Sequence, residues 1–269
     1  MGNSPLVPDG SHAHRVAREH AELVGRAVDV LAGACRHRAV ALACTGRVLD
    51  SVDAVGKHVF YRFAGEVVLH VHFGVRGTAR AATANEPLGS DVAVRLSAGD
   101  VAWDLLRPHR CELVTLAREA TLRAQLGPDP LGPSGSTDRA WQRVRATDEP
   151  LAAVLLDQTI VSGVGSEVAA EAMHAARLHP LIPAPDVRRH EFTILWEEIA
   201  RRMESAADEP DLLEERPPER RSARPPHVYR RKRCRRCGKP VHRARVRQRT
   251  AYFCPQCQQA RGPRSSMPR

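Results

Sequence analysis

Four cysteines near the C-terminal end have the type and spacing of metal ligands. They form two pairs, Cys234-Arg-Arg-Cys237 and Cys254-Pro-Gln-Cys257, which residues 238–253 separate. Two such pairs supply four thiolates at the spacing of a tetrahedral zinc site. Because four sulfur ligands leave no coordination position for a water molecule, the spacing predicts one structural Zn²⁺ ion.

The segment between the cysteine pairs carries arginines at every second position: Arg243, Arg245, Arg247 and Arg249. Strand periodicity would place all four guanidinium groups on one face of a hairpin. A guanidinium group can donate two parallel hydrogen bonds to two oxygens of a phosphate, and binding through such contacts depends steeply on salt concentration. The pattern therefore predicts nucleic-acid binding, and the alternative is a basic face that only aids solubility.

The formal net charge of +10 is concentrated in the same part of the chain. Residues 216–249 hold fifteen Lys or Arg against the single acid Glu219, a balance of +14, and residues 250–269 add three arginines. Residues 1–215 therefore carry a formal net charge of −7. A solvated or disordered tail is the alternative to a nucleic-acid surface on composition alone, and the cysteines favour the surface.

The other cysteines, Cys35, Cys44 and Cys111, are isolated in apolar or mixed surroundings and are predicted to be buried as small hydrophobic residues. Packing or surface roles are expected for the histidines His12, His14, His70 and His72. The chain has no run long enough to cross a membrane and no signal-peptide core, and unpaired thiols indicate a reducing compartment. These features predict a cytoplasmic protein with no membrane contact, and the predicted nucleic-acid binding would make it nucleoid-associated.

The hydrophobic pattern of the first half predicts one helix and then strands. Apolar residues recur at helical spacing from Ala13 to Leu31. Short β-branched runs follow, of which Val59–Phe63 and Val67–Phe73 flank Ala64-Gly-Glu66 and predict a hairpin. Further strands are expected at Val92–Leu96 and Cys111–Leu116.

The pattern changes after a Gly- and Pro-rich break at Leu126–Leu131, which predicts a domain boundary. Residues from Thr137 to Arg177 are helical in pattern, with interruptions at Asp148-Glu-Pro150 and Ser162–Ser166. This order predicts a helix, two turns and another helix. A further helix is expected at Arg189–Met203, before an acidic and proline-rich linker.

Four segments of the chain resemble segments of the Fpg/Nei family of DNA glycosylases (formamidopyrimidine-DNA glycosylase and endonuclease VIII), in particular its actinobacterial Nei-like members. They follow one another in the order that the family has. Residues 246–258, Val-Arg-Gln-Arg-Thr-Ala-Tyr-Phe-Cys-Pro-Gln-Cys-Gln, are similar to the family's C-terminal end, where a zinc-held hairpin presents an arginine. Residues 155–166 resemble its helix, two turns, helix signature. Gly56-Lys-His58 with His72–Gly77, and Pro8-Asp-Gly10 at the N-terminus, complete the likeness.

The resemblance implies an α+β, multidomain fold: an N-terminal β-sandwich with a flanking helix, a helix-two-turns-helix domain and a C-terminal zinc-finger β-hairpin. DNA would lie in the cleft between the first two domains. The expected boundaries are 1–7 for an N-terminal extension or misassigned start, 8–126 for the catalytic sandwich, 127–204 for the helical DNA-binding domain, 205–228 for the linker, 229–260 for the zinc finger and 261–269 for a disordered tail.

The resemblance also implies an activity, the repair of DNA by excision of damaged, oxidised bases followed by lyase cleavage of the abasic site through β/δ-elimination. Its partner would be double-stranded DNA with damaged bases or abasic sites, bound by a monomer. The roles carried over are Pro8 as nucleophile, Asp9 as acid, Lys57 and Arg249 as phosphate clamps and proton donors, Gly163, Gly165 and Ser166 as phosphate contacts, and Val75 as a wedge beside the vacated base.

The chain departs from the family pattern at several of these positions. The family nucleophile is a free N-terminal proline, whereas seven residues precede Pro8 and make its nitrogen an amide. A misassigned start at Val7 would free Pro8 after methionine removal; the rival interpretation is a genuine extension with the proline chemistry lost. Asp9 replaces Glu and Ser166 replaces Asn, and Val75 replaces a larger wedge.

These departures leave two alternatives to an active glycosylase. One is a diverged paralogue that binds damaged or abasic DNA without Schiff-base catalysis. The other is a zinc-ribbon protein for single-stranded nucleic acid, although aromatic residues, the usual stacking platforms, make up only 4% of the chain.

Overall fold

The computed structural model describes residues 9–132, 136–208 and 225–260. Pro8, the predicted extension 1–7, the predicted tail 261–269 and most of the predicted linker lie outside the described residues. The described chain divides between Leu126 and Gly127 into two compact units. The first unit comprises residues 9–126 with 207–208, and the second comprises residues 127–206 with 225–260.

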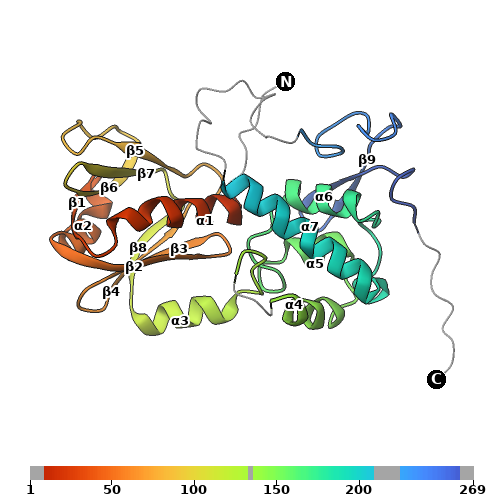
Figure 1. The fold of residues 1–269 in the computed structure, drawn as a ribbon, viewed down its shortest axis with the longest axis horizontal. Helices are drawn as coiled ribbons and strands as arrows, with labels where there is room; N and C mark the ends of the chain where they lie inside the picture. The colour runs from red at the N-terminus through yellow and green to blue at the C-terminus, as the bar shows by residue number, and fades with distance from the viewer. Residues whose placement is uncertain (1–8, 133–135, 209–224, 261–269) are drawn as a thin grey trace. The chain divides into compact units, whose positions relative to one another are not determined.

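The first unit is built on eight antiparallel strands among its described residues, in the order β5-β7-β6-β1-β2-β3-β4-β8 (Figure 1). β1 joins β2 through only two residue pairs, so the strands form two four-stranded layers. One layer contains β1 (Ala27–Ala32), β5 (Thr78–Ala82), β6 (Val92–Ala98) and β7 (Val101–Leu106), and the other contains β2 (Arg47–Val55), β3 (His58–Phe63), β4 (Val67–His72) and β8 (Arg110–Val114).

A single apolar core holds these layers together. It combines Val28 and Leu96 from one layer with Tyr61 and Leu69 from the other, and all four side chains are buried. Helices α1 (Gly10–Glu19) and α2 (Arg38–Cys44) contribute further buried residues, including Val16 and Cys44. The predicted sandwich with a flanking helix is confirmed. Cys44 is buried as expected.

The predicted hairpin is confirmed, because β3 and β4 pair from Phe63 opposite Val67 around the 64–66 turn. Gly65 has a φ of +79° there, which a side chain would disfavour. The strand at Val92–Leu96 is also confirmed, as part of β6. The expectation for Cys35 is wrong: it is exposed, at the start of a 3₁₀ turn (Cys35–His37).

The predicted helix Ala13–Leu31 is correct only in its first half. α1 ends at Glu19, a 3₁₀ turn spans His20–Leu23, and Gly25, with a φ of +80°, turns the chain into β1. Burial in β1 alternates, so Val28 and Val30 fit a strand as well as a helical spacing. Apolar spacing over so few residues does not separate the two structures.

The predicted strand Cys111–Leu116 also ends early. β8 stops at Val114, and the Thr115 hydroxyl accepts a hydrogen bond of 3.1 Å from the Arg118 N–H. This N-cap starts helix α3 (Leu116–Gln125). The apolar Leu116 therefore belongs to a helix rather than to the strand.

The second unit contains helices α4 (Ser136–Arg145), α5 (Leu151–Leu156), α6 (Ser166–Ala175) and α7 (Arg189–Ala207), with a 3₁₀ turn at Ala184–Asp186. The predicted helix, two turns and helix correspond to α5, residues 157–165 and α6. The helix expected at Arg189–Met203 is confirmed and extends to Ala207. None of the helices in the described ranges is long and apolar enough to cross a membrane.

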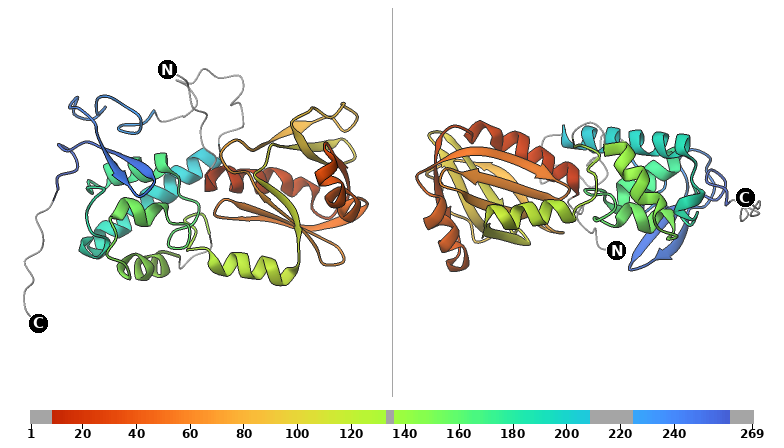
Figure 2. Two further views of the ribbon diagram at one scale, coloured as in Figure 1. Left: turned by 180° about the vertical axis from the view of Figure 1, so that it is seen from behind. Right: turned by 90° about the horizontal axis from the view of Figure 1, so that it is seen from below.

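The hairpin of β9 (His242–Val246) and β10 (Arg249–Phe253) belongs to this unit and lies against its helices (Figure 2). Val246 and Ala251 of the hairpin are buried in the same core as Leu155 and Met173. The hairpin is therefore anchored to the helical module by packing.

Candidate nucleic-acid interface and zinc centre

The four predicted ligand cysteines come together at the base of the β9–β10 hairpin. Their Sγ atoms all lie within 4.8 Å of one another, with 3.5 Å between Cys237 and Cys254 and 3.9 Å between Cys234 and Cys257. Four thiolates bound to zinc at about 2.3 Å would be about 3.8 Å apart. The cluster fits one tetrahedral Zn²⁺ ion, and no position in it remains for a catalytic water.

Each cysteine pair is held in a tight turn by backbone hydrogen bonds. In the first turn the Gly238 N–H donates to the Cys234 carbonyl at 2.8 Å, and Gly238 has a φ of +74°. In the second turn the Gln258 N–H donates to the Cys254 carbonyl at 2.8 Å. The buried Gln258 side chain also accepts from the Cys254 N–H and donates to the Leu178 carbonyl, so it ties this turn to the helical module.

Glu171 of α6 fastens the chain segment that enters the zinc finger. Its buried carboxylate accepts hydrogen bonds of 2.8–2.9 Å from the backbone N–H groups of His227, Val228 and Tyr229. Burial alone would raise the pKa of Glu171, but these donors outweigh burial and hold the pKa below its ordinary value. The finger is therefore docked on α6 by a charged acceptor as well as by its core residues.

The predicted single face of four arginines is wrong. The register pairs Val246 with Arg249 and Arg245 with Thr250, so Arg247 and Gln248 form the turn. Residues directly opposite in an antiparallel pair share a face. Arg249 therefore shares the face of buried Val246, and Arg245 lies on the other face.

The arginines also differ in their partners. Arg247 has a φ of +50° and pairs with Asp157 at 3.1 Å and Glu149 at 3.4 Å, contacts that fasten the turn to the helices. The Arg243 guanidinium lies 5.6 Å from the Tyr252 ring centroid. Arg245 and Arg249 are exposed and have no hydrogen bond or ion pair with any residue in the described ranges. Arg249 is thus free to meet a phosphate.

The loop between α5 and α6 is organised by Gln158. Its side-chain oxygen accepts from the Gly163 N–H at 3.0 Å, and its amide nitrogen donates to the carbonyls of Leu156 and Val164. The Gly163 N–H therefore already has an acceptor within the protein, and the predicted contact of Gly163 with phosphate stays a prediction. Gly163 still shapes the turn, with a φ of +85°.

Gly165 and Ser166 lie at the N-terminus of α6. Gly165 is the N-cap residue, and no side chain caps the helix. Within the described chain the N–H groups of Gly165 and Ser166 have no acceptor. A helix N-terminus with free N–H groups favours an anion. The acidic Glu167 in the first turn opposes that preference.

Asp9 and Lys57 of the first unit lie within electrostatic reach of each other, in family-like positions. Asp9 is the N-cap of α1 and accepts hydrogen bonds from the Ser11 N–H at 3.0 Å and from the Ser11 hydroxyl. Burial raises the pKa of Asp9, while Ser11 and the charge of Lys57 oppose that shift. Lys57 follows Gly56 in the turn between β2 and β3. Asp9 is thus suited to hold a proton.

Val75 occupies an exposed turn after β4, as a wedge would. Its relative accessibility is 58%, and it follows Gly74, which has a φ of +70°. A Cβ atom on Gly74 would lie 2.6 Å from the Cβ of His109. The turn before β8 therefore packs closely beneath the Val75 turn.

Of the histidines predicted to have packing or surface roles, His12 and His70 are buried, in agreement with that expectation.

Glu171 and Gln158 are structurally important residues that the sequence interpretation missed. Glu171 stands alone among apolar residues in Val168-Ala-Ala-Glu-Ala-Met173, and an isolated acid on a buried helix face is a signal for a specific partner. Gln158 lies in a loop without comparable local pattern. The hydrogen-bond partners of Gln158 could be identified only once the structure of the loop was known.

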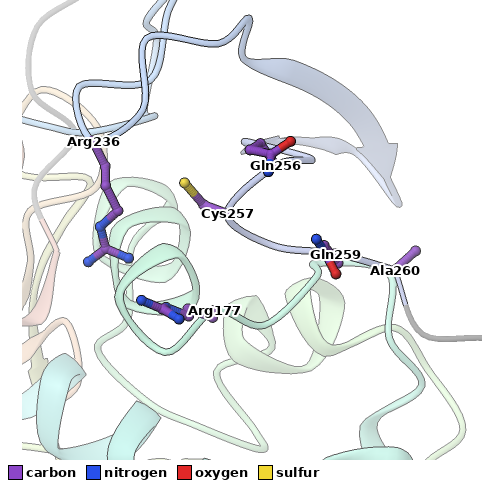
Figure 3. A pocket seen from close by; sticks show the side chains of 6 residues that line it. All are labelled: Arg177, Arg236, Gln256, Cys257, Gln259 and Ala260. Atoms are coloured by element: carbon purple, nitrogen blue, oxygen red, sulfur yellow. The ribbon is translucent and has the colours of Figure 1, made fainter.

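A surface cavity of about 500 Å³ lies beside the zinc centre, lined by Arg177, Arg236, Gln256, Cys257, Gln259 and Ala260 (Figure 3). Arg177 follows the C-terminal end of α6, whereas Gly165 and Ser166 lie at its N-terminal end. The cavity is therefore separate from the predicted phosphate contact on that helix.

The first unit presents a desolvated acid within electrostatic reach of a lysine, and the second presents a basic hairpin with a four-cysteine zinc site on a helical module. Together they define a protein that acts on nucleic acid. Two family models match the chain: the "Formamidopyrimidine-DNA glycosylase H2TH domain" over residues 126–211 and the "Zinc finger found in FPG and IleRS" over residues 231–260.

Curated relatives match along most of the chain. "Endonuclease 8 1" of Mycobacterium tuberculosis is 33% identical over 268 residues, which cover 94% of this chain and 100% of the relative. "Formamidopyrimidine-DNA glycosylase" of Thermus thermophilus is 33% identical over 241 residues, with 83% of this chain and 86% of the relative covered. The chain therefore belongs to the Fpg/Nei family of DNA glycosylases.

Solved structures agree with this fold. The Lactococcus lactis formamidopyrimidine-DNA glycosylase, crystallised non-covalently bound to DNA containing an AP site, superposes with a TM-score of 0.76 at 20% identity. The match covers 94% of this chain and 100% of that one. At this identity the likeness concerns the fold.

Proposed function

We propose that this chain is a DNA glycosylase with abasic-site lyase activity when Pro8 is its N-terminal residue. The observation that carries the proposal is the environment of Asp9. A carboxyl group directly after the proline caps α1, has a pKa raised by burial, and lies within electrostatic reach of Lys57. A carboxyl group whose pKa is raised keeps its proton to higher pH and can act as a general acid.

In the proposed reaction the secondary amine of Pro8 attacks C1′ of the damaged nucleotide. The bond from C1′ to the base breaks, the sugar ring opens, and Asp9 supplies a proton as the Schiff base forms. Loss of a C2′ proton to water then breaks the C3′–O bond, and a second elimination breaks the C5′–O bond. Hydrolysis of the Schiff base then releases the sugar fragment and returns the Pro8 amine. Lys57 would contact the phosphates and donate protons to these leaving groups.

The proposed substrate is double-stranded DNA with an oxidised base or an abasic site. A base that is to be excised must leave the stack. The exposed Val75 would fill the vacated space. Arg249 and the amides of Gly165 and Ser166 would hold flanking phosphates. None of them has another partner among the residues that the structure describes, which supports this assignment. A monomer working at the nucleoid in the cytoplasm suffices for this reaction.

A second candidate is a protein that binds damaged or abasic DNA without cutting it. Three features favour it: the seven residues before Pro8, the side chain of Asp9, which is one methylene shorter than Glu, and Ser166 in place of an amide. A reacting group displaced by about 1 Å can lose roughly a hundredfold in rate. Binding through Arg249 would survive all three changes.

Borohydride trapping separates the two candidates. Protein that begins at Pro8, and separately the full chain, are incubated with abasic-site DNA and borohydride, and the adduct is mapped by peptide mass. The glycosylase proposal expects an adduct on Pro8 with the first protein and none with the second. No adduct with either protein, together with retained DNA binding, would favour the non-cutting binder.

The native start is tested by the intact mass of the protein from its host. A chain that begins at Pro8 would fit the active form. Retention of residues 1–7 would exclude the restart at Val7 and leave the proline blocked.

A further inference from the structure

Arg247, in the turn of the β9–β10 hairpin, has a backbone conformation that a side chain disfavours. Its φ of +50° lies in the left-handed region, where glycine is the usual residue. A larger residue in that region costs stability and persists where surrounding contacts hold it. The arginine pattern of the hairpin predicted that Arg247 binds nucleic acid. Its contacts in the folded protein point to a different role.

The two terminal nitrogens of the Arg247 guanidinium contact separate carboxylates. Nη1 lies 3.1 Å from Oδ2 of Asp157, and Nη2 lies 3.4 Å from Oε1 of Glu149. A guanidinium group presents its donors in a rigid planar fork, whereas an ammonium group is a point charge. Two carboxylates on one fork therefore restrain the direction of the side chain as well as its distance.

A rigid part of the helical module carries both carboxylates. Glu149 directly precedes Pro150, the N-cap of α5, and Asp157 is the C-cap residue at the other end of this helix. Residues 151–155 between them are buried. The Ala184 N–H also donates to the Glu149 carbonyl at 3.0 Å. The turn of the hairpin is therefore tied to fixed points at both ends of one buried helix.

Asp157 uses its two carboxylate oxygens for different partners. Oδ1 accepts hydrogen bonds from the Thr159 N–H at 3.0 Å and from the Thr159 hydroxyl at 2.6 Å, whereas Oδ2 accepts from Arg247. The hydrogen bonds from Thr159, with a contribution from Arg247, hold the pKa of Asp157 below its ordinary value, so this carboxylate is ionised at neutral pH. One side chain thus joins the hairpin turn to the start of the loop between α5 and α6.

The two segments joined in this way lead to the proposed phosphate contacts. Arg249 follows Arg247 by two residues, directly after the turn. Gly165 and Ser166 lie at the far end of the loop that begins at Asp157. Contacts to phosphates fix the register of a protein on a duplex, and the phosphates of a strand have a set spacing. Donors on two segments can hold flanking phosphates together only if the distance between the segments is fixed.

We propose that Arg247 is a positioning residue rather than a DNA contact, and that it fixes the hairpin turn against the loop of residues 157–165. Its ion pairs with Asp157 and Glu149 set the distance between Arg249 and the N-terminus of α6. The proposal rests on the proposed function, which gives Arg249 and the α6 N-terminus their phosphates. The rival interpretation is that Arg247 only adds positive charge.

The two interpretations predict opposite signs for Asp157→Asn. The amide has a single oxygen, and when this oxygen accepts from Thr159, a nitrogen donor faces Arg247. We expect the full chain to bind a duplex with a tetrahydrofuran abasic-site analogue about fivefold more weakly, the effect of one lost, partly exposed ion pair. If only positive charge mattered, removal of an acid would strengthen binding. Unchanged or tighter binding would overturn the proposal.

Asp148→Asn is the matched control for this substitution. Asp148 lies next to Glu149, is exposed and has no hydrogen bond or ion pair with the residues that the structure describes. Its replacement changes the net charge by the same amount without touching Arg247. The affinity of Asp148→Asn should stay the same or rise slightly. Equal weakening of both variants would refute a specific role for the Asp157 pair.

Arg247→Lys tests the guanidinium fork without a change of net charge. A lysine keeps one positive charge but cannot direct two nitrogens at Asp157 and Glu149. We expect about fivefold weaker binding to the same duplex. Arg247→Lys combined with Asp157→Asn should lose less than the sum of the two, because both remove the same pair. Full affinity of Arg247→Lys, or losses that add in the double variant, would contradict the proposal.

Hydrogen exchange measures the restraint of the turn in the absence of DNA. With zinc content as the folding control, the backbone amides of residues 244–251 should exchange faster in Asp157→Asn and Arg247→Lys than in the unchanged protein. Asp148→Asn should match the unchanged protein. Identical exchange in all four proteins would refute the positioning role. If protein that begins at Pro8 forms no borohydride adduct, the proposed function fails, whereas hydrogen exchange still decides whether Arg247 restrains the turn.

Discussion

The first unit places its candidate catalytic groups among hydrogen-bonded neighbours, whereas the second leaves its candidate DNA contacts without partners. Asp9 caps a helix through Ser11 and is desolvated, and the charge of Lys57 acts on it. Arg249, by contrast, is exposed and contacts no hydrogen-bonding or ionic partner in the described chain. The N–H groups of Gly165 and Ser166 are similarly free.

This difference follows from the tasks of the two sites. A proton donor needs an altered pKa, and burial or a nearby charge alters it. A phosphate contact needs a permanent charge in a fixed place, and an arginine is charged at any physiological pH. Under the proposed function, the first unit would therefore control protonation, and the second would only control position, through the zinc site and Glu171. Four experiments test this comparison.

Loss of zinc should have the largest effect and should be confined to the second unit. In Cys257→Ser the finger loses a ligand, and structural zinc contributes on the order of 10 kcal/mol to such modules. We expect zinc content near zero by mass spectrometry and DNA affinity reduced by more than about a hundredfold. The first unit should remain folded, because its core is separate from that of the second.

The control is Cys35→Ser, which changes an exposed cysteine of the first unit. It should keep both zinc and DNA affinity. Zinc retained by Cys257→Ser at full occupancy would contradict the four-thiolate site.

Asp9→Asn should abolish acid catalysis while preserving the fold. The amide oxygen can still cap α1 by accepting from Ser11, but the group cannot donate an acidic proton. We expect excision to slow by a factor of about 10²–10⁴ in protein that begins at Pro8. Because the acid must be protonated, the rate of the unchanged enzyme should fall as pH rises through the raised pKa of Asp9, and the pH–rate profile of Asp9→Asn should lack this fall. If the rate of Asp9→Asn still falls at alkaline pH, another residue is the general acid.

Several parts of this arrangement could be predicted from sequence because their determinants are local. The zinc site depends on two Cys-X-X-Cys turns, and the β3–β4 hairpin depends on Gly65 between two β-branched runs. The helices around residues 157–165 are marked by periodicity and by Pro and Gly breaks. In each case neighbouring residues determine the structure, so tertiary contacts are not needed to infer it.

Other parts depend on contacts that no local pattern reveals. The arginine pattern predicted one face, but the turn falls at Arg247 and Gln248, without the glycine that usually marks a two-residue turn. The hydrogen bonds of His70 with His58 and Glu112 join residues that are separate in sequence, and they require the strand register. The sequence therefore failed to predict the contacts within the sites, although it did identify most of their residues.

Arg249→Ala against Arg245→Ala tests whether position, and not charge alone, matters in the second unit. Both arginines are exposed and lack partners in the described chain, but they lie on opposite faces of the hairpin. We expect Arg249→Ala to lose about 1–3 kcal/mol of DNA-binding free energy and about one unit in the slope of log affinity against log salt concentration. Arg245→Ala should lose much less of both. Zinc content is the control for folding. Equal losses would mean that the hairpin acts only as diffuse positive charge.

Glu171→Gln should have the smallest effect, because the amide oxygen still accepts from the backbone of His227–Tyr229. Hydrogen bonds to a charged acceptor are stronger than neutral ones, so we expect about 1 kcal/mol lower stability of the zinc-bound protein in thermal unfolding. The folded pKa of Glu171 is lowered, so its extra stabilisation is complete above the unfolded pKa of about 4.3 and is lost only as pH falls through the folded pKa.

The difference between the unchanged protein and Glu171→Gln should therefore not shrink from pH 8 to pH 5, with zinc content measured at each pH. Nδ1 of His227 lies 3.3 Å from Oε2 of Glu171, and protonation of that ring would only add to the difference. Comparing the two proteins at each pH cancels any effect of the cysteine ligands, which both share. A difference that shrinks between pH 7 and pH 5.5 would mean that burial outweighs the three N–H donors of His227, Val228 and Tyr229. The second unit would then contain a protonation-sensitive group of the kind that the comparison assigns only to the first.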